Sequence, residues 1–220
     1  MINQEILREY DIRGIFQKSL TLKDVEYISF KLATIIKETQ SHQIIIGHDG
    51  RNSSLEIKNT LIENFLRFGI DVYDISLTPT PISYFANKYF KIPNLIMITG
   101  SHNPKEYNGL KITIDEKPFF GDRIKTLNQI SNCKESQSAG NLYFKSPIEP
   151  YSIEILDRFR DINKLKIVWD PGNGAIAPII HRIVDAIGGY NIILNRSIDG
   201  TFPNHHPDPT IKKNIFQISE

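Results

Sequence analysis

The order of apolar and polar positions along the chain alternates between the spacing of helices and that of buried strands. Between residues 22 and 39 the apolar side chains recur at helical spacing, so they share one face. Thr21 and Asp24 supply an N-terminal cap and an acidic first turn for this helix. The predicted strands are 43–47, 71–75, 95–98 and 109–114, and the predicted helices are 22–39, the stretch between residue 54 and Gly69, and 82–90, the last of them after a stiff connection over 78–81.

This alternation of strands and helices predicts an α/β fold with a mostly parallel sheet and helices on both faces. The periodicity fails over 132–146, where the sequence is polar and without pattern, so we take this stretch as a junction between domains. The pattern after it predicts a helix over 150–161, a strand over 166–169, a helix over 175–187 and a strand over 190–194. The sequence therefore predicts one α/β domain over 1–135 and a second of the same type over 147–220.

Composition and charge narrow the class of protein without identifying it. An apolar content of 40% and a charged content of 23% are those of an ordinary globular protein. The net charge of +1 gives no general attraction to nucleic acid or to a membrane surface, so any anion has to be bound locally. Cys133 is the only cysteine, and the first residues lack the basic and apolar regions of a signal peptide. No apolar run approaches the ~20 residues of a membrane span, and we expect a cytoplasmic protein.

The richest cluster of chemical groups follows the predicted strand at 95–98. It has the sequence Thr99-Gly100-Ser101-His102-Asn103-Pro104, which is rich in residues that reverse a backbone sharply. Open α/β sheets place their ligands at the carboxyl ends of strands, where Ser101 is expected to lie. Its hydroxyl, with the neighbouring imidazole and amide and the ammonium groups of Lys105 and Lys111, suits an enzyme that carries a phosphoryl group on serine. The alternative is a plain turn. A hydrolase elbow is excluded, because Thr99 and Asn103 stand where it needs glycine.

The serine stretch and the residues after it together resemble a motif of a known protein family. The serine stretch, followed by Asn108-Gly109-Leu110-Lys111, closely resembles the active-serine loop of the α-D-phosphohexomutases, the phosphoglucomutase and phosphomannomutase family. Tyr10-Asp11-Ile12-Arg13-Gly14 resembles the opening motif of the bacterial members, whose tyrosine and arginine lie in the active cleft. The resemblance spans nearly the whole chain. It implies a three-layer αβα domain with a mixed, mostly parallel sheet, and an isomerase that interconverts hexose 1- and 6-phosphates through phosphorylated Ser101, with a hexose 1,6-bisphosphate as activator.

The residue types and the resemblance together assign roles within this site. His102 is the candidate proton acceptor, and Lys111 and Arg13 are expected to stabilise the phosphoryl group during transfer. The resemblance implies that Tyr10 shapes the cleft and that Asn103 orients the loop by hydrogen bonding. For Arg13 the alternative is a strand residue that merely pairs with a carboxylate.

A glycine motif in the second domain competes with this reading. Gly172-Asn173-Gly174-Ala175-Ile176-Ala177 lies between a predicted strand and helix, as a dinucleotide-binding loop would. However, Asn195 and Arg196 stand where a ribose-binding acid is expected, and Pro171 disrupts the approach to Gly172. We therefore favour a structural turn whose glycines allow close packing, as in the second domain of the resembled family, with NAD binding as the alternative.

Two further stretches have competing interpretations. For Asp49-Gly50-Arg51 we favour a loop with an internal ion pair over a loop that contacts phosphate. The stretch 199–209 holds two histidines and two aspartates, which suggests a metal site. Adjacent His205 and His206 point in different directions in an extended chain, so we do not expect both to bind one zinc ion.

The sequence also lacks a feature of the resembled family. There, Mg²⁺ is bound by the phosphoserine and by three aspartates of an Asp-Gly-Asp-x-Asp-Arg loop in the second domain. No such loop occurs here, and the sequence ends at Glu220, shortly before the loop would be expected. We therefore expect an incomplete second domain, with Ser101 as a metal ligand through its phosphate. The expected ligand is a phosphorylated hexose and the expected partner a carboxyl-terminal half. The alternative is an inactive remnant or a binding-only module.

Overall fold

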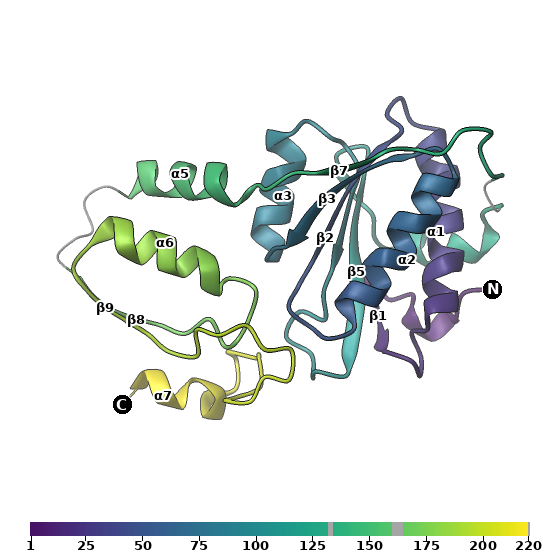
Figure 1. Ribbon diagram of the computed structural model, residues 1–220. Coiled ribbons are helices and arrows are strands. Elements are labelled where there is room, and N and C mark those ends of the chain that lie inside the picture. The colour runs from purple at the N-terminus through teal and green to yellow at the C-terminus, as the bar shows by residue number, and fades with distance from the viewer. Residues whose placement is uncertain (132–133, 160–164, 220) are drawn as a thin grey trace.

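The computed structural model describes residues 1–131, 134–159 and 165–219 of the chain. Figure 1 shows a large sheet flanked by helices, with a smaller unit beside it. The large sheet has seven strands, with β1, β5, β4, β2, β3 and β7 side by side and β6 paired to β5. The strands are β1 (Ile12–Ile15), β2 (Gln43–His48), β3 (Asp71–Leu77), β4 (Leu95–Ile98), β5 (Tyr107–Ile114), β6 (Lys117–Pro118) and β7 (Leu142–Phe144).

Helices cover both faces of this sheet, because its central strands are apolar on both sides. Ile44 and Ile46 of β2 join the core beneath α1 (Leu22–Lys37) and α2 (Ser54–Arg67). Ile45 points the other way and packs with residues such as Ala86 of α3 (Thr80–Tyr89), since successive strand residues face opposite sides. The layers are therefore helix, sheet and helix, as the sequence predicted. Short helices complete the unit: η1 (Gln4–Ile6), α4 (Asp122–Lys125) and η2 (Leu127–Gln129).

The sheet is mixed, and this brings several chain segments to one edge. β2 runs parallel to β3 and β4, whereas β5 runs antiparallel to both β4 and β1. The end of β4 and the start of β5 are therefore neighbours, with Ile98 opposite Leu110. The turn after β2 lies at the same edge, because Asp49 donates its backbone N–H to the Ile98 carbonyl at 2.9 Å. This edge carries the serine loop.

The second unit follows the predicted order of one helix and then β-α-β. Its two strands, β8 (Lys166–Trp169) and β9 (Tyr190–Ile193), pair in parallel. The ring of Phe85 in α3 meets that of Tyr151 in α5 edge-on at 5.3 Å, so the second unit packs against the first. Its helices are α5 (Ile148–Arg158), α6 (Ala177–Ile187), η3 (Lys212–Ile215) and α7 (Phe216–Ser219).

Two local expectations are corrected. The stretch 132–146, predicted to lack structure, contains β7, which pairs in parallel with β3 while the ring of Tyr143 stacks on Tyr73 at 4.9 Å. A strand of three residues is too short to show a period, and its partner is distant in sequence. The connection 78–81 also ends earlier than predicted, because a helix tolerates Pro81 in its first turn, where no hydrogen bond from its nitrogen is needed.

Some predictions fall partly outside the described residues. Residues 132–133 of the predicted junction and residues 160–161 of the predicted helix 150–161 are among them. The domain boundaries 1–135 and 147–220 remain predictions, and β7 lies between them. No helix within the described ranges has both the length and the apolar character needed to cross a bilayer.

Candidate active site

The loop that follows β4 makes its sharp turn at Ser101. This residue has a φ of +52°, in the left-handed region that non-glycine residues seldom adopt. Its N–H donates to Thr99 Oγ1 at 2.8 Å, and the N–H and side-chain amide of Asn103 both donate to the Gly100 carbonyl, at 3.0 and 3.1 Å. These short-range bonds use backbone atoms of the loop, and the Ser101 side chain is exposed. Asn103 thus makes a side-chain hydrogen bond within the loop, and its role in orienting the loop remains a prediction.

Arg51, which comes from the turn after β2, fastens this loop to the rest of the domain. Its side chain is fully buried, and its Nε lies 3.2 Å from Asp49 Oδ2, so the predicted internal ion pair is confirmed. The remaining guanidinium nitrogens donate to the carbonyl oxygens of Ser101 (2.9 Å), Asn103 (2.7 Å), Pro104 (2.6 Å) and Tyr107 (3.1 Å). One side chain therefore satisfies four backbone carbonyls around the serine. The sequence did not reveal this role.

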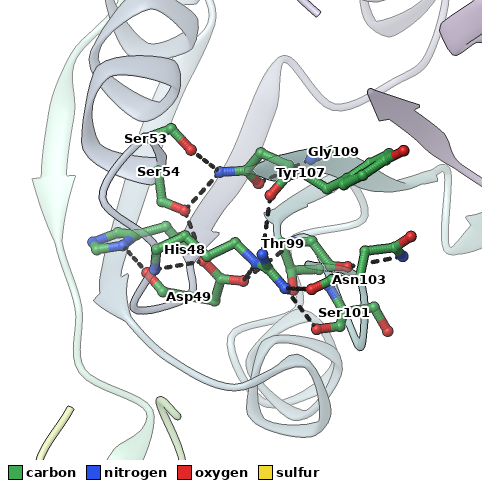
Figure 2. A network of polar contacts seen from close by, with 12 residues as sticks. His48, Asp49, Ser53, Ser54, Thr99, Ser101, Asn103, Tyr107 and Gly109 are labelled. Carbon is green, nitrogen blue, oxygen red and sulfur yellow. Dashed lines mark hydrogen bonds and ion pairs between the residues drawn. The ribbon is translucent and has the colours of Figure 1, made fainter. Parts of the chain in front are cut away.

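Asp49 links the same loop to the start of α2. Its carboxylate accepts hydrogen bonds from the Gly100 N–H at 3.2 Å and from Ser54 Oγ at 2.7 Å. The side-chain amide of Asn108 in β5 donates to Ser53 Oγ and Ser54 Oγ, at 2.8 and 3.0 Å. Figure 2 shows the hydroxyls of Ser53 and Ser54 in this polar network above Asp49. The loop is thereby tied to β2, α2 and β5 through polar groups with partners, which is how buried polar networks become rigid.

All six predicted site residues line one cavity of about 390 Å³. Segments far apart in the sequence meet there, because β1 and β4 are the two neighbours of β5 in the sheet. The cavity is lined by Arg8, Glu9, Tyr10, Asp11, Arg13, Ser101, His102, Asn103 and Lys111. Lys105 lies elsewhere, in a hollow that it shares with Thr201 and Phe202. Six of the nine residues that line this cavity were thus predicted site residues, and Arg8, Glu9 and Asp11 were not.

Asp11 is the acidic residue that the sequence reasoning missed. Its carboxylate pairs with the Arg13 guanidinium, and Lys111 Nζ lies 3.9 Å away from it. The carboxylate partner that was the alternative for Arg13 is therefore present, and Arg13 also donates to the Gly100 carbonyl. Its contact with a phosphoryl group remains a prediction. Residues two apart on an extended chain face the same side, and this spacing of Asp11 and Arg13 was the available signal.

The positive charge around the serine loop is concentrated. Burial lowers the pKa of the Arg51 guanidinium, Asp49 opposes this, and the nearby charge of Arg13 lowers the pKa further. Within the described part of the chain, Arg13 Nε has no hydrogen-bond partner. Arg13 and Lys111 therefore line the same cavity as Ser101, and the Arg51 guanidinium is bound to the backbone carbonyls of the serine loop. Such an arrangement can bind an anion and stabilise a phosphoryl group.

A second cavity, of about 340 Å³, lies between the two units and also reaches Ser101. Its far wall includes Asp170, Gly172 and His205. The Gly172 N–H donates to Asp170, whose carboxylate also pairs with His205 at 2.7 Å. A Cβ on Gly172, where φ is +57°, would lie 3.2 Å from the His205 ring. The amide and the space that a dinucleotide phosphate would use are thus occupied by protein, which supports the structural interpretation of this turn.

Among the residues that the structure describes, no group of three or more His, Cys, Asp or Glu side chains could hold a metal ion. The Asp49 carboxylate near Ser101 is already engaged by Arg51, Ser54 and the backbone of Gly100. These residues alone do not form a Mg²⁺ site.

Comparisons with known proteins agree with the helix–sheet–helix architecture of the first unit. Residues 4–137 match the family described as "Phosphoglucomutase/phosphomannomutase, alpha/beta/alpha domain I", and the chain belongs to this family. It is 34% identical over 214 residues to a phosphomannomutase/phosphoglucomutase of Pseudomonas syringae pv. tomato, covering 97% of this chain and 46% of that protein. It is 33% identical over 220 residues to a phosphoglucomutase of Neisseria meningitidis, covering 99% of this chain and 48% of that protein.

A solved structure extends this similarity to the arrangement of both units. A phosphoglucomutase/phosphomannomutase family protein of Burkholderia thailandensis superposes with a TM-score of 0.89 at 30% identity. The match covers 99% of this chain and 50% of that one. The chain therefore spans about half the length of the relatives that it matches.

Proposed function

We propose that this chain is the phosphoserine-bearing part of a phosphohexomutase, which interconverts the 1- and 6-phosphates of a hexose. The observation that carries the proposal is the common cavity of Ser101, His102, Lys111 and Arg13, which come from three segments: β1, the loop after β4, and β5. The proposal also rests on family membership, and on relatives named as phosphomannomutase/phosphoglucomutase and phosphoglucomutase. The family is one of isomerases.

In the proposed reaction, phosphorylated Ser101 gives its phosphoryl group to a hydroxyl of the hexose phosphate. The bond between phosphorus and Ser101 Oγ breaks as a bond to the sugar oxygen forms, and His102 accepts the hydroxyl proton. The imidazolium then gives this proton to Ser101 Oγ, so the products are a hexose bisphosphate and Ser101 with its hydroxyl restored. In the return step His102 takes the proton from Ser101 Oγ, which receives the other phosphoryl group, and gives it to the sugar oxygen that is released, which restores the phosphoserine and yields the isomeric monophosphate.

The cations act on the charge of the group in transfer. Lys111 is 29% exposed and Arg13 is buried, so one ammonium faces the cavity while a fixed guanidinium supports the loop. Tyr10 is 79% exposed at the mouth of the cavity, where we propose that it contacts the sugar. The resemblance implies Mg²⁺ as the cofactor, but no step is assigned to that ion, since the described residues do not by themselves build its site.

Turnover by this chain alone is a separate question. Because relatives are about twice as long, we propose that full activity needs groups that this chain does not contain, supplied as a carboxyl-terminal half. The competing function is a binding-only module or an inactive remnant. Mutase assays with Mg²⁺ on the chain alone, and then with the carboxyl-terminal half of a relative added, separate them. Rescue supports the mutase, and hexose phosphate binding without rescue supports the module. We propose the cytoplasm as its compartment.

The direct test is phosphate transfer to the serine. The chain is incubated with a hexose 1,6-bisphosphate and Mg²⁺, with and without the added half, and analysed by intact mass and phosphopeptide mapping. We expect one phosphate on Ser101, none in Ser101→Ala, and normal uptake in Ser146→Ala, a serine exposed outside the cavity. Phosphate found exclusively at other residues would remove the assignment.

A further inference from the structure

A ring of the second unit lies on the residue that fastens the serine loop. The Cζ atom of Arg51 is 5.1 Å from the centre of the Phe202 ring, within the range of a cation–π contact. Arg51 belongs to the turn after β2, and Phe202 belongs to the segment that follows β9. The same guanidinium donates to the Ser101 carbonyl at 2.9 Å. The Arg51 side chain therefore links the Phe202 ring to the backbone of Ser101.

Two glycines let the segment carrying Phe202 approach the turn closely. A Cβ on Gly200 would lie 2.6 Å from the Gly50 carbonyl oxygen and 2.8 Å from the backbone nitrogen of Asn52. A Cβ on Gly50 would lie 2.7 Å from Ile198 Cγ2. The contact is largely backbone against backbone, which leaves little room for side-chain adjustment. The position of the second unit therefore fixes where the Phe202 ring lies.

The segment itself is held in shape by the second unit. The Asp199 N–H donates to the carbonyl of Asn173 in the glycine turn at 3.0 Å, and the Phe202 N–H donates to the Asp199 carbonyl at 3.0 Å. Asp199 Oδ1 also accepts from the N–H and the hydroxyl of Thr201, at 2.8 and 2.7 Å. Phe202 has a φ of +50°, a strained conformation for an aromatic residue, so its ring direction is set by the surrounding contacts.

We infer that Phe202 is a positioning residue for Ser101, acting through Arg51. With the second unit seated, the ring covers the guanidinium and holds it against the four loop carbonyls. When the segment moves away, Arg51 gains access to water and the loop bonds weaken. The inference deepens the proposed function and rests on it for its catalytic meaning. The mechanical coupling between Phe202 and the serine loop does not depend on the proposed function.

Hydrogen exchange of the full chain, read by mass spectrometry on the peptide that covers residues 99–108, tests the coupling. We expect exchange there to be roughly tenfold faster in Phe202→Leu, which removes the cation–π contact, and in Gly200→Ala, which separates the backbones. Phe202→Tyr keeps the ring and should restore the original rate. The matched control is Tyr190→Leu, an aromatic residue of β9 that is 62% exposed. Unchanged exchange in Phe202→Leu, or equal acceleration in Tyr190→Leu, overturns the inference.

A second readout links the coupling to chemistry. The rate of phosphate transfer to Ser101 from a hexose 1,6-bisphosphate should fall roughly tenfold in Phe202→Leu and stay unchanged in Tyr190→Leu. If the unaltered chain takes up no phosphate at Ser101 even with the carboxyl-terminal half added, the proposed function fails, while the exchange experiment still decides the coupling. If exchange accelerates without any fall in transfer rate, Phe202 is not a positioning residue for the reaction.

Discussion

Arg51 holds Ser101 by its backbone and leaves its hydroxyl alone: the guanidinium Nη2 lies 2.9 Å from the serine carbonyl oxygen. Arg51 therefore holds the loop without a hydrogen bond to the hydroxyl that would react. A loop fastened through carbonyls keeps its conformation whether or not the hydroxyl carries a phosphate. The left-handed turn at Ser101, with φ of +52°, is the strained feature that this fastening stabilises.

Replacing Arg51 with lysine should therefore destabilise the fold and loosen the loop. One ammonium group cannot reach four carbonyls and Asp49 at once, so buried acceptors lose their partners, and we expect a loss of about 3 kcal/mol in the free energy of unfolding. Urea denaturation measures it. Arg67→Lys is the control, since Arg67 is 42% exposed and pairs with Glu135 at the surface, and its replacement should cost less than about 1 kcal/mol. Similar losses for the two variants would contradict the role of Arg51.

Lys111 should matter for transfer and little for stability. Its ammonium lines the cavity and lies 3.9 Å from Asp11, so Lys111→Met removes a charge that is not tightly paired. We expect the rate of Ser101 phosphorylation to fall roughly 100-fold, with a stability change under about 1 kcal/mol. Lys117→Met, at a residue 76% exposed and outside the cavity, is the matched control and should leave the rate unchanged. A normal rate in Lys111→Met would exclude Lys111 from the transferring site.

His102 is the imidazole nearest in sequence to the serine, and it lines the same cavity. If it accepts the proton, His102→Gln should slow phosphate transfer at Ser101 roughly 100-fold, because glutamine hydrogen-bonds but does not take up a proton at neutral pH. Single-turnover phosphorylation under matched conditions gives the two rates. His42→Gln, an exposed histidine before β2, controls for loss of a histidine as such. Equal rates for both variants and the unaltered chain would assign the proton to another acceptor.

What the sequence predicted correctly was local or periodic. The apolar run at 44–46 is buried on both sides in the structure, and the strand that precedes the serine ends where its pattern ends. The six predicted site residues could be identified because each belongs to a short sequence motif. The order of strands in the sheet then brings these motifs together around one cavity. Asp11 and Asp49 each stand two residues before an arginine, and this spacing is a local sign of the ion pairs that they form.

The parts that were missed depend on contacts between distant residues. β7 becomes a strand only because β3 offers it an edge. The four carbonyl partners of Arg51 lie at least 50 residues away from it, and Phe202 is farther still. No window of sequence contains both members of these pairs, so propensity and periodicity do not reveal them.

The ion pair between Asp170 and His205 makes the second unit sensitive to pH. Both ring nitrogens of His205 lie opposite oxygens that only accept, the Asp170 carboxylate at 2.7 Å and the His206 carbonyl at 3.0 Å. Only the protonated imidazolium donates to both. Burial of the ring works against its charge, but these two hydrogen bonds outweigh it and raise the pKa of His205 above its usual 6.5. For Asp170, burial opposes ionisation, but bonds from Asn195, Gly172 and His205 lower its pKa below the usual 3.8.

The signs of these shifts define a pH window. A raised pKa in the folded state means that His205 contributes its full stabilisation below 6.5 and loses it as the pH rises through the folded-state value. A lowered pKa means that Asp170 contributes fully above 3.8 and loses its contribution as the pH falls through its folded-state value. The Asp170–His205 ion pair therefore stabilises the folded state most between pH 3.8 and pH 6.5.

His205→Gln should accordingly cost more stability in mild acid than in mild base. We expect a loss of about 2 kcal/mol in the free energy of unfolding near pH 5.5, falling to under about 1 kcal/mol near pH 9. Urea denaturation at the two pH values, followed by the fluorescence of Trp169 in β8, measures the difference within the second unit. The Asp170→Asn background provides the double-mutant cycle, because without the carboxylate the effect of His205→Gln should lose most of its pH dependence. A loss that is the same at both pH values, or one that grows toward alkaline pH, would show that the imidazolium does not hold this turn.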